Sequence, residues 1–113
     1  VKCFNVGIGS RTSIVHFNSG HAQNSGVVHI VRNSDNPNIV LSLDSLTIDP
    51  VSFIKIDVEG HELSSFEGMK LLLERDKPLI WVEDNKGKAV PYLKSLGYKI
   101  LEEDKLTKDY LMI

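Results

Sequence analysis

The sequence predicts an α/β domain with a mostly parallel sheet and helices on its faces. In the second half of the chain, short apolar segments alternate with segments whose apolar residues recur at helical spacing. Their order is strand, helix, strand, helix and two strands, which is typical of a largely parallel sheet. The 113 residues, 42% of them hydrophobic, are enough for one core. We therefore expect residues 1–113 to form a single domain.

Composition excludes several classes of function. Thirteen basic and fifteen acidic residues are spread along the chain, giving a net charge of −2, so we expect no binding to nucleic acid or to an anionic membrane. The lone Cys3 excludes an internal disulfide framework and a cysteine-based zinc cluster, which fits a reducing compartment. No apolar run approaches the roughly 20 residues of a membrane span. We expect a cytoplasmic protein, and strand-like residues directly after Val1 favour a start within a longer protein.

The first half is predicted to be rich in β-structure. Residues 1–8 and 12–17 are strand-like and separated by a short turn, which favours a hairpin. Small polar residues at 18–26 predict a loop, and the same composition at 33–38 predicts a turn. Apolar residues at 27–31 and 39–43 predict two more extended segments.

The second half begins with a strand at 53–58 and continues with an amphipathic helix of about four turns from His61 to Arg75. Pro78 ends that helix. The apolar residues at helical spacing are Leu63, Phe66, Met69, Leu72 and Leu73. Gly68 lies among them and costs about 1 kcal/mol relative to alanine, so we expect it to be there for close packing against the sheet.

Three strands and a short helix complete the prediction. The segment 78–83 is a strongly apolar strand. Val90, Leu93 and Leu96 mark the helix, with Pro91 in its first turn and Gly97 as its end. Two last strands, at 98–103 and 110–113, flank a charged turn.

Acidic side chains follow two neighbouring strands at the point where each strand ends. Asp57 closes the strand at 53–58, and Glu83 with Asp84 closes the strand at 78–83. If these strands are parallel, their carboxyl ends meet at one edge of the sheet, where α/β proteins bind ligands. Oxygen ligands of this kind suit a divalent cation such as Mg²⁺. Lys55 shares a strand face with Asp57, and we expect it within salt-bridge reach of Asp57 or Glu83.

Structural explanations compete with these functional ones. Glu59 and Glu62 could simply favour a helix N-terminus through the helix dipole. Asp84 and Asn85 could form an ordinary turn before the following helix. Both alternatives stay open at the level of the sequence.

Four segments together resemble the FkbM-type methyltransferases. They are "NVGIGSRTSIVHF" (5–17), "SLDSL" (42–46), "FIKIDVEGHELSSFEGM" (53–69) and "KPLIWVE" (77–83). The resemblance covers nearly the whole chain. It implies a Rossmann-like class I methyltransferase fold with helices on both faces of the sheet, and S-adenosylmethionine as cofactor. It also implies methylation of hydroxyl groups on sugars, glycolipids or polyketide-like small molecules.

The resemblance also implies that part of the domain lies upstream. In this family the glycine-rich loop and the acidic residue that bind the cofactor precede the segment matched by Val1 onward. We therefore expect residues 1–113 to be the second part of a methyltransferase domain, without the N-terminal cofactor-binding half and inactive as an isolated chain. Cofactor-binding residues are not assigned.

Methyl transfer requires an acceptor oxygen held in line and relieved of its proton. Asp57 and Glu83 are the candidate catalytic carboxylates, and His61 is the competing general base because imidazole accepts a proton near neutral pH. By analogy with catechol-type O-methyltransferases, Asp57, Glu83 and Asp84 are candidate ligands for Mg²⁺, which would lower the pKa of the acceptor hydroxyl.

Two other functions are considered. The chain could be a non-catalytic, degenerate methyltransferase fragment that binds a partner, including a second copy, through its exposed sheet edge. A metal-dependent hydrolase using the same carboxylates ranks third, because hydrolytic metal sites usually add histidine ligands and only His61 is near.

Overall fold

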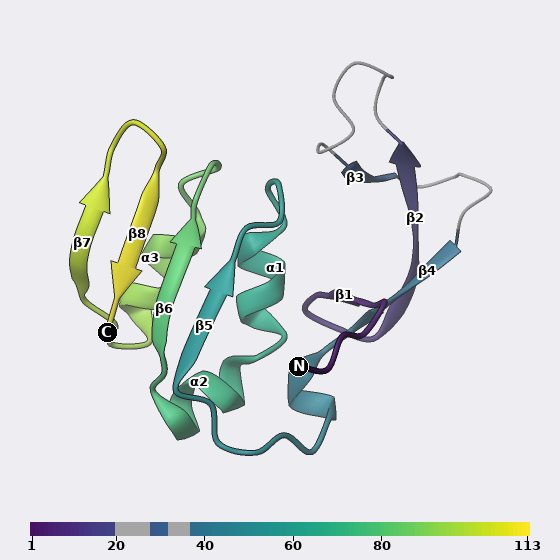
Figure 1. Cartoon of the computed structure of the whole chain (residues 1–113), viewed down its shortest axis with the longest axis horizontal. Helices are drawn as coiled ribbons and strands as arrows, with labels where there is room; N and C mark the ends of the chain where they lie inside the picture. The colour runs from purple at the N-terminus through teal and green to yellow at the C-terminus, as the bar shows by residue number, and fades with distance from the viewer. Residues whose placement is uncertain (20–27, 32–36) are drawn as a thin grey trace.

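The computed structural model describes residues 1–19, 28–31 and 37–113, which form two four-stranded sheets and three short helices (Figure 1). The predicted loop at 18–26 and turn at 33–38 fall mostly on residues 20–27 and 32–36, outside the described residues. No helix in the described ranges is both long enough and apolar enough to cross a membrane.

The first sheet has the order β1-β4-β2-β3. Its strands are β1 (Gly7–Ile8), β2 (Ser13–Ser19), β3 (Val28–Val31) and β4 (Pro37–Leu41). β1 lies parallel to β4, whereas β2 is antiparallel to both β4 and β3. The predicted hairpin between the first two segments is therefore wrong. The Gly9 N–H donates to the carbonyl of Leu41 at 3.0 Å, so the chain continues along β4 instead of turning back onto β1.

The second sheet has the order β5-β6-β8-β7. Its strands are β5 (Phe53–Ile56), β6 (Leu79–Glu83), β7 (Ile100–Asp104) and β8 (Asp109–Met112). β5 and β6 are parallel, as predicted, while β8 is antiparallel to β6 and β7. The α/β class is confirmed, but both sheets are mixed.

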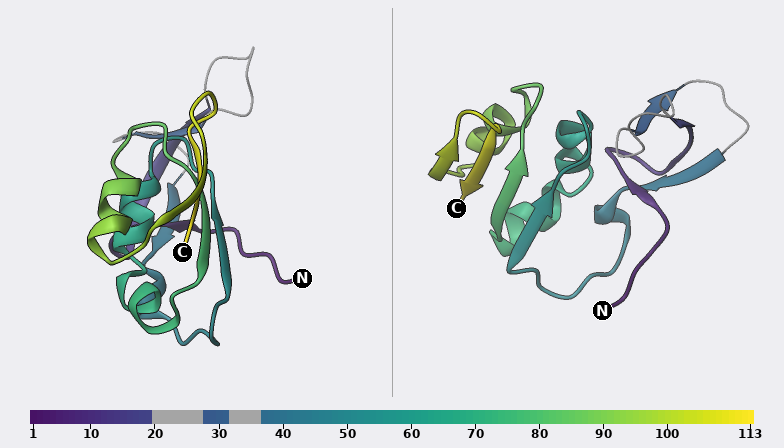
Figure 2. Two further views of the ribbon diagram at one scale, coloured as in Figure 1. Left: turned by 90° about the vertical axis from the view of Figure 1, so that its left-hand side faces the viewer. Right: turned by 45° about the horizontal axis from the view of Figure 1, so that its top comes forward.

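The helices α1 (Glu62–Glu67), α2 (Lys70–Asp76) and α3 (Ala89–Ser95) lie on one face of the second sheet (Figure 2). In the described part of the chain the other face carries no helix, which differs from the expected cover on both faces. α3 agrees with the predicted helix. The 3₁₀ turn η1 (Leu43–Ser45) precedes β5.

The single helix predicted from His61 to Arg75 is wrong, because the chain breaks between α1 and α2. The Asp44 carboxylate accepts the N–H groups of Leu71 and Leu72 at 2.9 and 3.1 Å. Those amides lie in the first turn of α2, where a helix has no internal acceptors for its N–H groups. Asp44 thus gives α2 an N-terminus of its own.

Gly68 lies at this break and packs tightly, as expected, but its neighbour is the turn after β1. A Cβ on Gly68 would overlap the carbonyl oxygen of Gly9 and would lie 2.6 Å from its carbonyl carbon. The carbonyl of Gly68 also accepts the Ser42 hydroxyl at 2.9 Å and the Asp44 N–H at 3.0 Å. The helix break is therefore attached to β1 and to η1 through backbone contacts.

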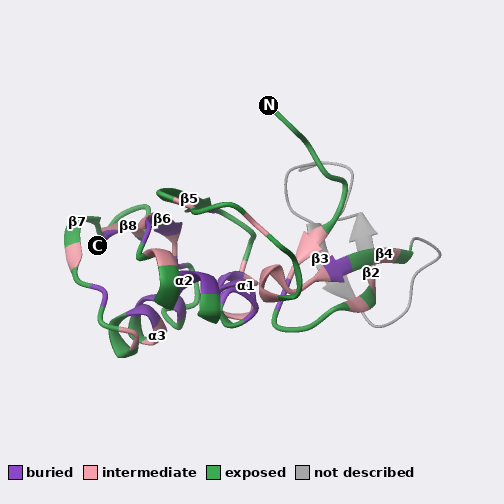
Figure 3. Cartoon of the chain, turned by 90° about the horizontal axis from the view of Figure 1, so that it is seen from below, coloured by how far each residue is buried: buried purple, intermediate pink, exposed green. Residues whose placement is uncertain are grey.

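The hydrophobic core lies between the helices and the second sheet (Figure 3). Its fully buried side chains come from α1, α2, α3, β6 and β8, and include Phe66, Leu73, Ile80, Val82, Leu93 and Met112. Alternation along β6 buries Ile80 and Val82 while Trp81 stays 45% exposed. The core thus fixes which face of each strand points toward solvent.

Candidate functional site at the carboxyl ends of β5 and β6

Asp57 and Glu83 lie at the same edge of the second sheet, which we call the rim. Ile56 pairs with Val82 in the parallel register, so the next residue of each strand reaches the rim together. The Asp57 side chain is exposed, and Glu83 is half-buried. The Asn85 amide donates to Glu83 Oε1 at 2.7 Å, which orients that carboxylate. The rim predicted from the sequence is thus present.

Lys55 lies on the same strand face as Asp57, with 4.0 Å between Lys55 Nζ and Asp57 Oδ2. The predicted ion pair is therefore present at the outer limit of its range. Its two side chains are 60% and 46% exposed, and an exposed pair of this kind contributes less than about 1 kcal/mol. β5 is an edge strand in the described sheet, so Lys55 is solvated rather than buried.

Asp84 faces α3 instead of the rim. Its carboxylate is 2% exposed and accepts the N–H groups of Lys88 at 3.0 Å and Val90 at 2.9 Å. These bonds satisfy amides at the start of α3, which is the structural explanation considered for Asp84 and Asn85. Among the described residues, no group of three His, Cys, Asp or Glu side chains could hold a metal ion. The residues present do not fit a magnesium site made of Asp57, Glu83 and Asp84.

Glu62 likewise has a structural task. It lies in the first turn of α1, is 2% exposed, and accepts the Gly60 N–H on Oε1 at 2.6 Å. The turn between β5 and α1 includes Glu59 and Gly60, both with positive φ, at 48° and 89°. Glu62 therefore fixes the tight turn that leads from the rim into α1.

His61 follows this turn and lies half-buried between the rim and the first sheet. A Cβ on Gly9 would lie 3.2 Å from His61 Nε2, so the absence of a side chain at Gly9 makes room for the ring. Burial lowers the pKa of His61 below 6.5, the Glu62 carboxylate opposes this shift, and the Lys86 ammonium adds to it. His61 is consequently neutral, and able to accept a proton, at neutral pH.

A hollow of about 210 Å³ lies beside His61, between the loop after β5 and the loop after β6. We call it the rim hollow, and its lining residues are Gly60, His61, Glu62, Leu63, Ser64, Glu67, Asp84, Lys86 and Lys88. The two lysines were not selected from the sequence. The only available signal was the stretch "NKGKA" (85–89) directly after a strand, and nothing local connects it with His61.

A larger groove of about 550 Å³ separates β1 from β5. Most of its lining is apolar, including Ile8, Ile54, Ile56 and Met69, and Asp57 is one of its polar lining residues. The structure therefore places Asp57 in this groove and His61 in the rim hollow. The predicted catalytic residues Asp57 and Glu83 are brought to one edge, whereas His61 faces a different hollow.

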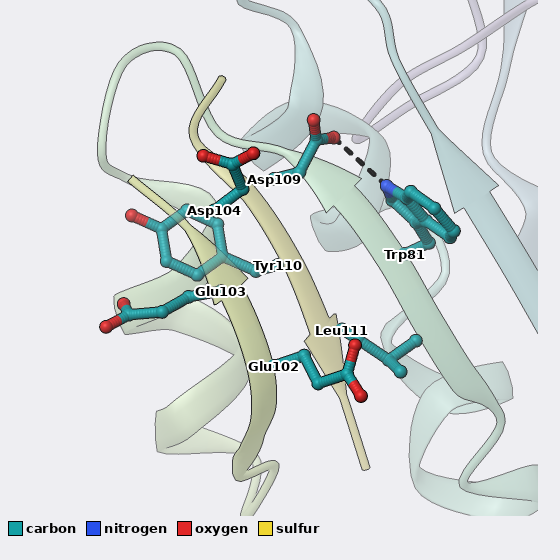
Figure 4. Close-up of a pocket in the computed structure, with 7 residues that line it drawn as sticks. All are labelled: Trp81, Glu102, Glu103, Asp104, Asp109, Tyr110 and Leu111. Atoms are coloured by element: carbon teal, nitrogen blue, oxygen red, sulfur yellow. Dashed lines mark hydrogen bonds between the residues drawn. The ribbon is translucent and has the colours of Figure 1, made fainter. Parts of the chain in front are cut away.

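A third hollow, of about 170 Å³, lies on the open face of β6, β8 and β7 (Figure 4). The Trp81 indole N–H donates to Asp109 Oδ1 across it at 3.0 Å. The pKa of Asp109 is lowered mainly by a hydrogen bond from the side chain of Thr107 and, to a smaller extent, by the bond from Trp81. Three further carboxylates line this hollow, from Glu102, Glu103 and Asp104.

The comparison with protein families identifies the chain. Residues 5–100 match the model of the methyltransferase FkbM domain. The chain therefore belongs to the FkbM methyltransferase family, as the sequence motifs indicated.

A solved structure of methyltransferase FkbM from Methylobacillus flagellatus KT has a similar fold. The TM-score is 0.60 at 21% sequence identity, and the match covers 95% of this chain and 26% of that chain. The chain thus spans about a quarter of the solved protein that it matches, and the likeness concerns the fold. No curated protein matches the chain.

Proposed function

We propose that this chain is part of an enzyme that transfers a methyl group from S-adenosylmethionine to a hydroxyl group of a small molecule. The match to the methyltransferase FkbM domain over residues 5–100 carries this proposal. The rim supports it, because Asp57 and Glu83 come together where ligands of α/β sheets bind. The acceptor is a hydroxyl compound such as a sugar, glycolipid or polyketide-like molecule.

The rim suits the chemistry of such a cofactor. When bound, S-adenosylmethionine supplies a methyl group on a positively charged sulfur. The carboxylates of Asp57 and Glu83 would supply negative charge at the rim, and their oxygens could accept a hydrogen bond from the acceptor hydroxyl. Preorganised groups of this kind lower the barrier mainly by positioning. The hydrogen bond from Asn85 holds Glu83 in place for this role.

Removal of the acceptor proton is the second requirement. His61 is half-buried and its pKa is below 6.5, so its ring is available as a base at neutral pH. Its position in the rim hollow places it beside the rim rather than between the two carboxylates. We propose Asp57 and Glu83 as the groups that accept the hydroxyl proton at the rim, with His61 in the adjacent hollow as the competing general base.

Calorimetric titration with S-adenosylmethionine and with its demethylated product tests the proposal. Because the upstream half is expected to bind the cofactor, the titration is made with the longer protein that contains it, and we expect that protein to bind both compounds with micromolar affinity. Parallel titrations with magnesium and with a chelator show whether binding depends on the metal. A protein that is folded by circular dichroism and binds neither compound would contradict the proposal.

The substitution Asp57→Ala tests the role of the rim. Asp57 is exposed, and among the described residues its ion pair is a long one with Lys55. In the longer protein that contains the upstream half, we therefore expect methyl transfer to fall by at least tenfold while the melting temperature changes little. Asp49→Ala provides the matched control, because Asp49 is also exposed and does not line the hollows described above. A drop in melting temperature that accounts for the lost activity would make Asp57 a structural residue.

A further inference from the structure

The rim hollow contains three carboxylates, two of which are already used by the fold. Glu62 accepts the Gly60 N–H at 2.6 Å, and Asp84 accepts the N–H groups of Lys88 and Val90. Both side chains are 2% exposed. Glu67, by contrast, is exposed to solvent.

The cations of the rim hollow are differently placed. Lys86 lies across the backbone of Gly60, where a Cβ would be 2.7 Å from Lys86 Nζ and would overlap its Cε. Neither Lys86 nor Lys88 has a carboxylate within salt-bridge distance in the ranges that the structure describes. Two lysines thus line the same hollow as His61 and three carboxylates, but in the described ranges neither ammonium group forms an ion pair with a carboxylate.

We propose that the rim hollow binds an anionic group, a phosphate or a carboxylate, through the ammonium groups of Lys86 and Lys88 beside His61. Lysine is a common ligand for phosphate, which it binds as a point charge. A volume of about 210 Å³ accommodates such a group, since a water molecule occupies about 30 Å³ in the liquid. The glycine at position 60 is required for this arrangement, because any side chain there would displace Lys86.

This inference rests on the proposed function where it concerns the substrate. An anion held by Lys86 and Lys88 would lie next to His61, the competing general base. The hydroxyl acceptor of the methyl group would therefore carry a phosphate or carboxylate that anchors it in the rim hollow. Both lysines are exposed, so binding should be weak and should fall as salt is added.

Nuclear magnetic resonance of the labelled chain, titrated with inorganic phosphate at constant ionic strength, tests the anion site directly. We expect saturable shifts of the backbone amides at 59–62 and 86–88. Lys86→Gln should weaken phosphate binding about tenfold, the loss expected for one hydrogen bond to a charged group. Lys94→Gln is the matched control, because Lys94 is exposed on α3 and does not line the hollow.

The ring protons of His61 give a second readout. Bound phosphate should raise the pKa of His61, and Lys86→Gln should raise it without phosphate, because a nearby positive charge has been removed. Titration with acetate instead of phosphate distinguishes the two anion chemistries. Shifts that do not saturate, that are spread over all lysines, or that survive in Lys86→Gln would overturn the anion site.

These results are independent of methyl transfer. An unchanged phosphate response in Lys86→Gln, in a protein that binds S-adenosylmethionine, would refute the anion site and leave the proposed function intact. Phosphate binding at the rim hollow in a longer protein that binds no S-adenosylmethionine would support the anion site and refute the proposed function. The exposed position of Lys86 means that the variant should fold, which the dispersion of its amide resonances verifies.

Discussion

Burial and neighbouring charges determine the chemistry of individual residues at the rim. His61 is half-buried, with Glu62 and Lys86 as the charged groups that influence it most, and the net result is a pKa below 6.5. The carboxylates of Asp84 and Glu62 accept hydrogen bonds from backbone amides. Asp57 and Glu83 keep oxygen atoms directed toward solvent or a side-chain amide. Carboxylates a few residues apart thus differ in whether backbone amides already occupy their oxygens.

His61 should make stability depend on pH. Its pKa is lower in the folded than in the unfolded chain, so the unfolded chain binds more protons as pH falls below about 6.5. The neutral ring therefore stabilises the fold fully above pH 6.5, and this contribution is lost as pH falls from there to the pKa of the folded state. Urea unfolding between pH 7 and pH 5 should show a steeper loss of stability in the wild type than in His61→Gln. Parallel curves for the two proteins would contradict this assignment.

At the scale of elements, short helices depend on side chains that come from elsewhere in the chain. α1, α2 and α3 have six or seven residues each, and helices of this length are marginal without tertiary contacts. Asp84 supplies acceptors at the start of α3, and Asp44 does so for α2. A carboxylate from a preceding segment therefore fixes where each of these two helices begins.

Removing the acceptor of α3 should destabilise the protein. Asp84→Ala leaves the buried N–H of Val90 without a partner, which we expect to cost about 2 kcal/mol in the free energy of unfolding. Asp104→Ala is the control, since Asp104 also accepts a backbone N–H, that of Leu106, but lies in an exposed turn where water can replace it. Chemical denaturation of both variants measures the difference. Similar losses would mean that burial of Asp84 is unimportant.

Gly68 should tolerate no side chain. In Gly68→Ala the new methyl group meets the carbonyl of Gly9, and we expect a cost of about 3 kcal/mol from the forced backbone shift. Gly87→Ala is the control for backbone strain, because Gly87 has a φ of 65° but nothing lies within 4 Å of the added atom. We expect this substitution to cost about 1 kcal/mol. Thermal melts that rank the two variants equally would remove the packing explanation.

Local sequence patterns predicted the positions of individual strands and helices, whereas features that depend on contacts between distant segments were not predicted. β6, α3, β7 and β8 lie within about two residues of the predicted segments, because apolar period, Pro91 and Gly97 act over a few residues. The break before Met69 was not visible, since the helical spacing continues across it and its cause is Asp44. The pairing of β1 with β4 and the approach of Lys86 to Gly60 are also long-range.

The candidate site follows the same rule. The parallel pairing of β5 with β6 follows from the strand and helix order, and it brought Asp57 and Glu83 to one rim as predicted. The direction of Asp84 could not be predicted, because it depends on where α3 starts relative to β6.

At the scale of the whole molecule, β5 and β7 are the two edge strands of the second sheet in the described part of the chain. β5 ends the order of its sheet, and Phe53 and Val58 beside it are 49% and 41% exposed. Unpaired edges invite strand pairing. The alternative of a non-catalytic fragment predicts that two copies pair through β5, and an antiparallel register about Ile56 would place Lys55 opposite Asp57 of the partner subunit.

Charge exchange tests this pairing. Lys55→Glu would place two carboxylates opposite each other, which is destabilising in paired strands, so sedimentation velocity should show dissociation into monomers. Adding Asp57→Lys to the same chain should restore the dimer. Lys99→Glu, at an exposed position outside β5, serves as the control. A wild-type chain that is monomeric at high concentration, or a double variant that stays monomeric, would argue against the edge as an interface.

The contact between Gly9 and Gly68 limits how the sequence can change over time. A side chain at Gly9 would meet Cγ1 of Val40 at 2.6 Å and Nε2 of His61 at 3.2 Å, and a smaller residue at position 40 would relieve the closer of these two contacts. A side chain at Gly68 would meet backbone atoms, which no substitution at another position removes. In a library of random variants selected for folding, Gly9 should therefore vary together with Val40, whereas Gly68 should remain glycine in every survivor.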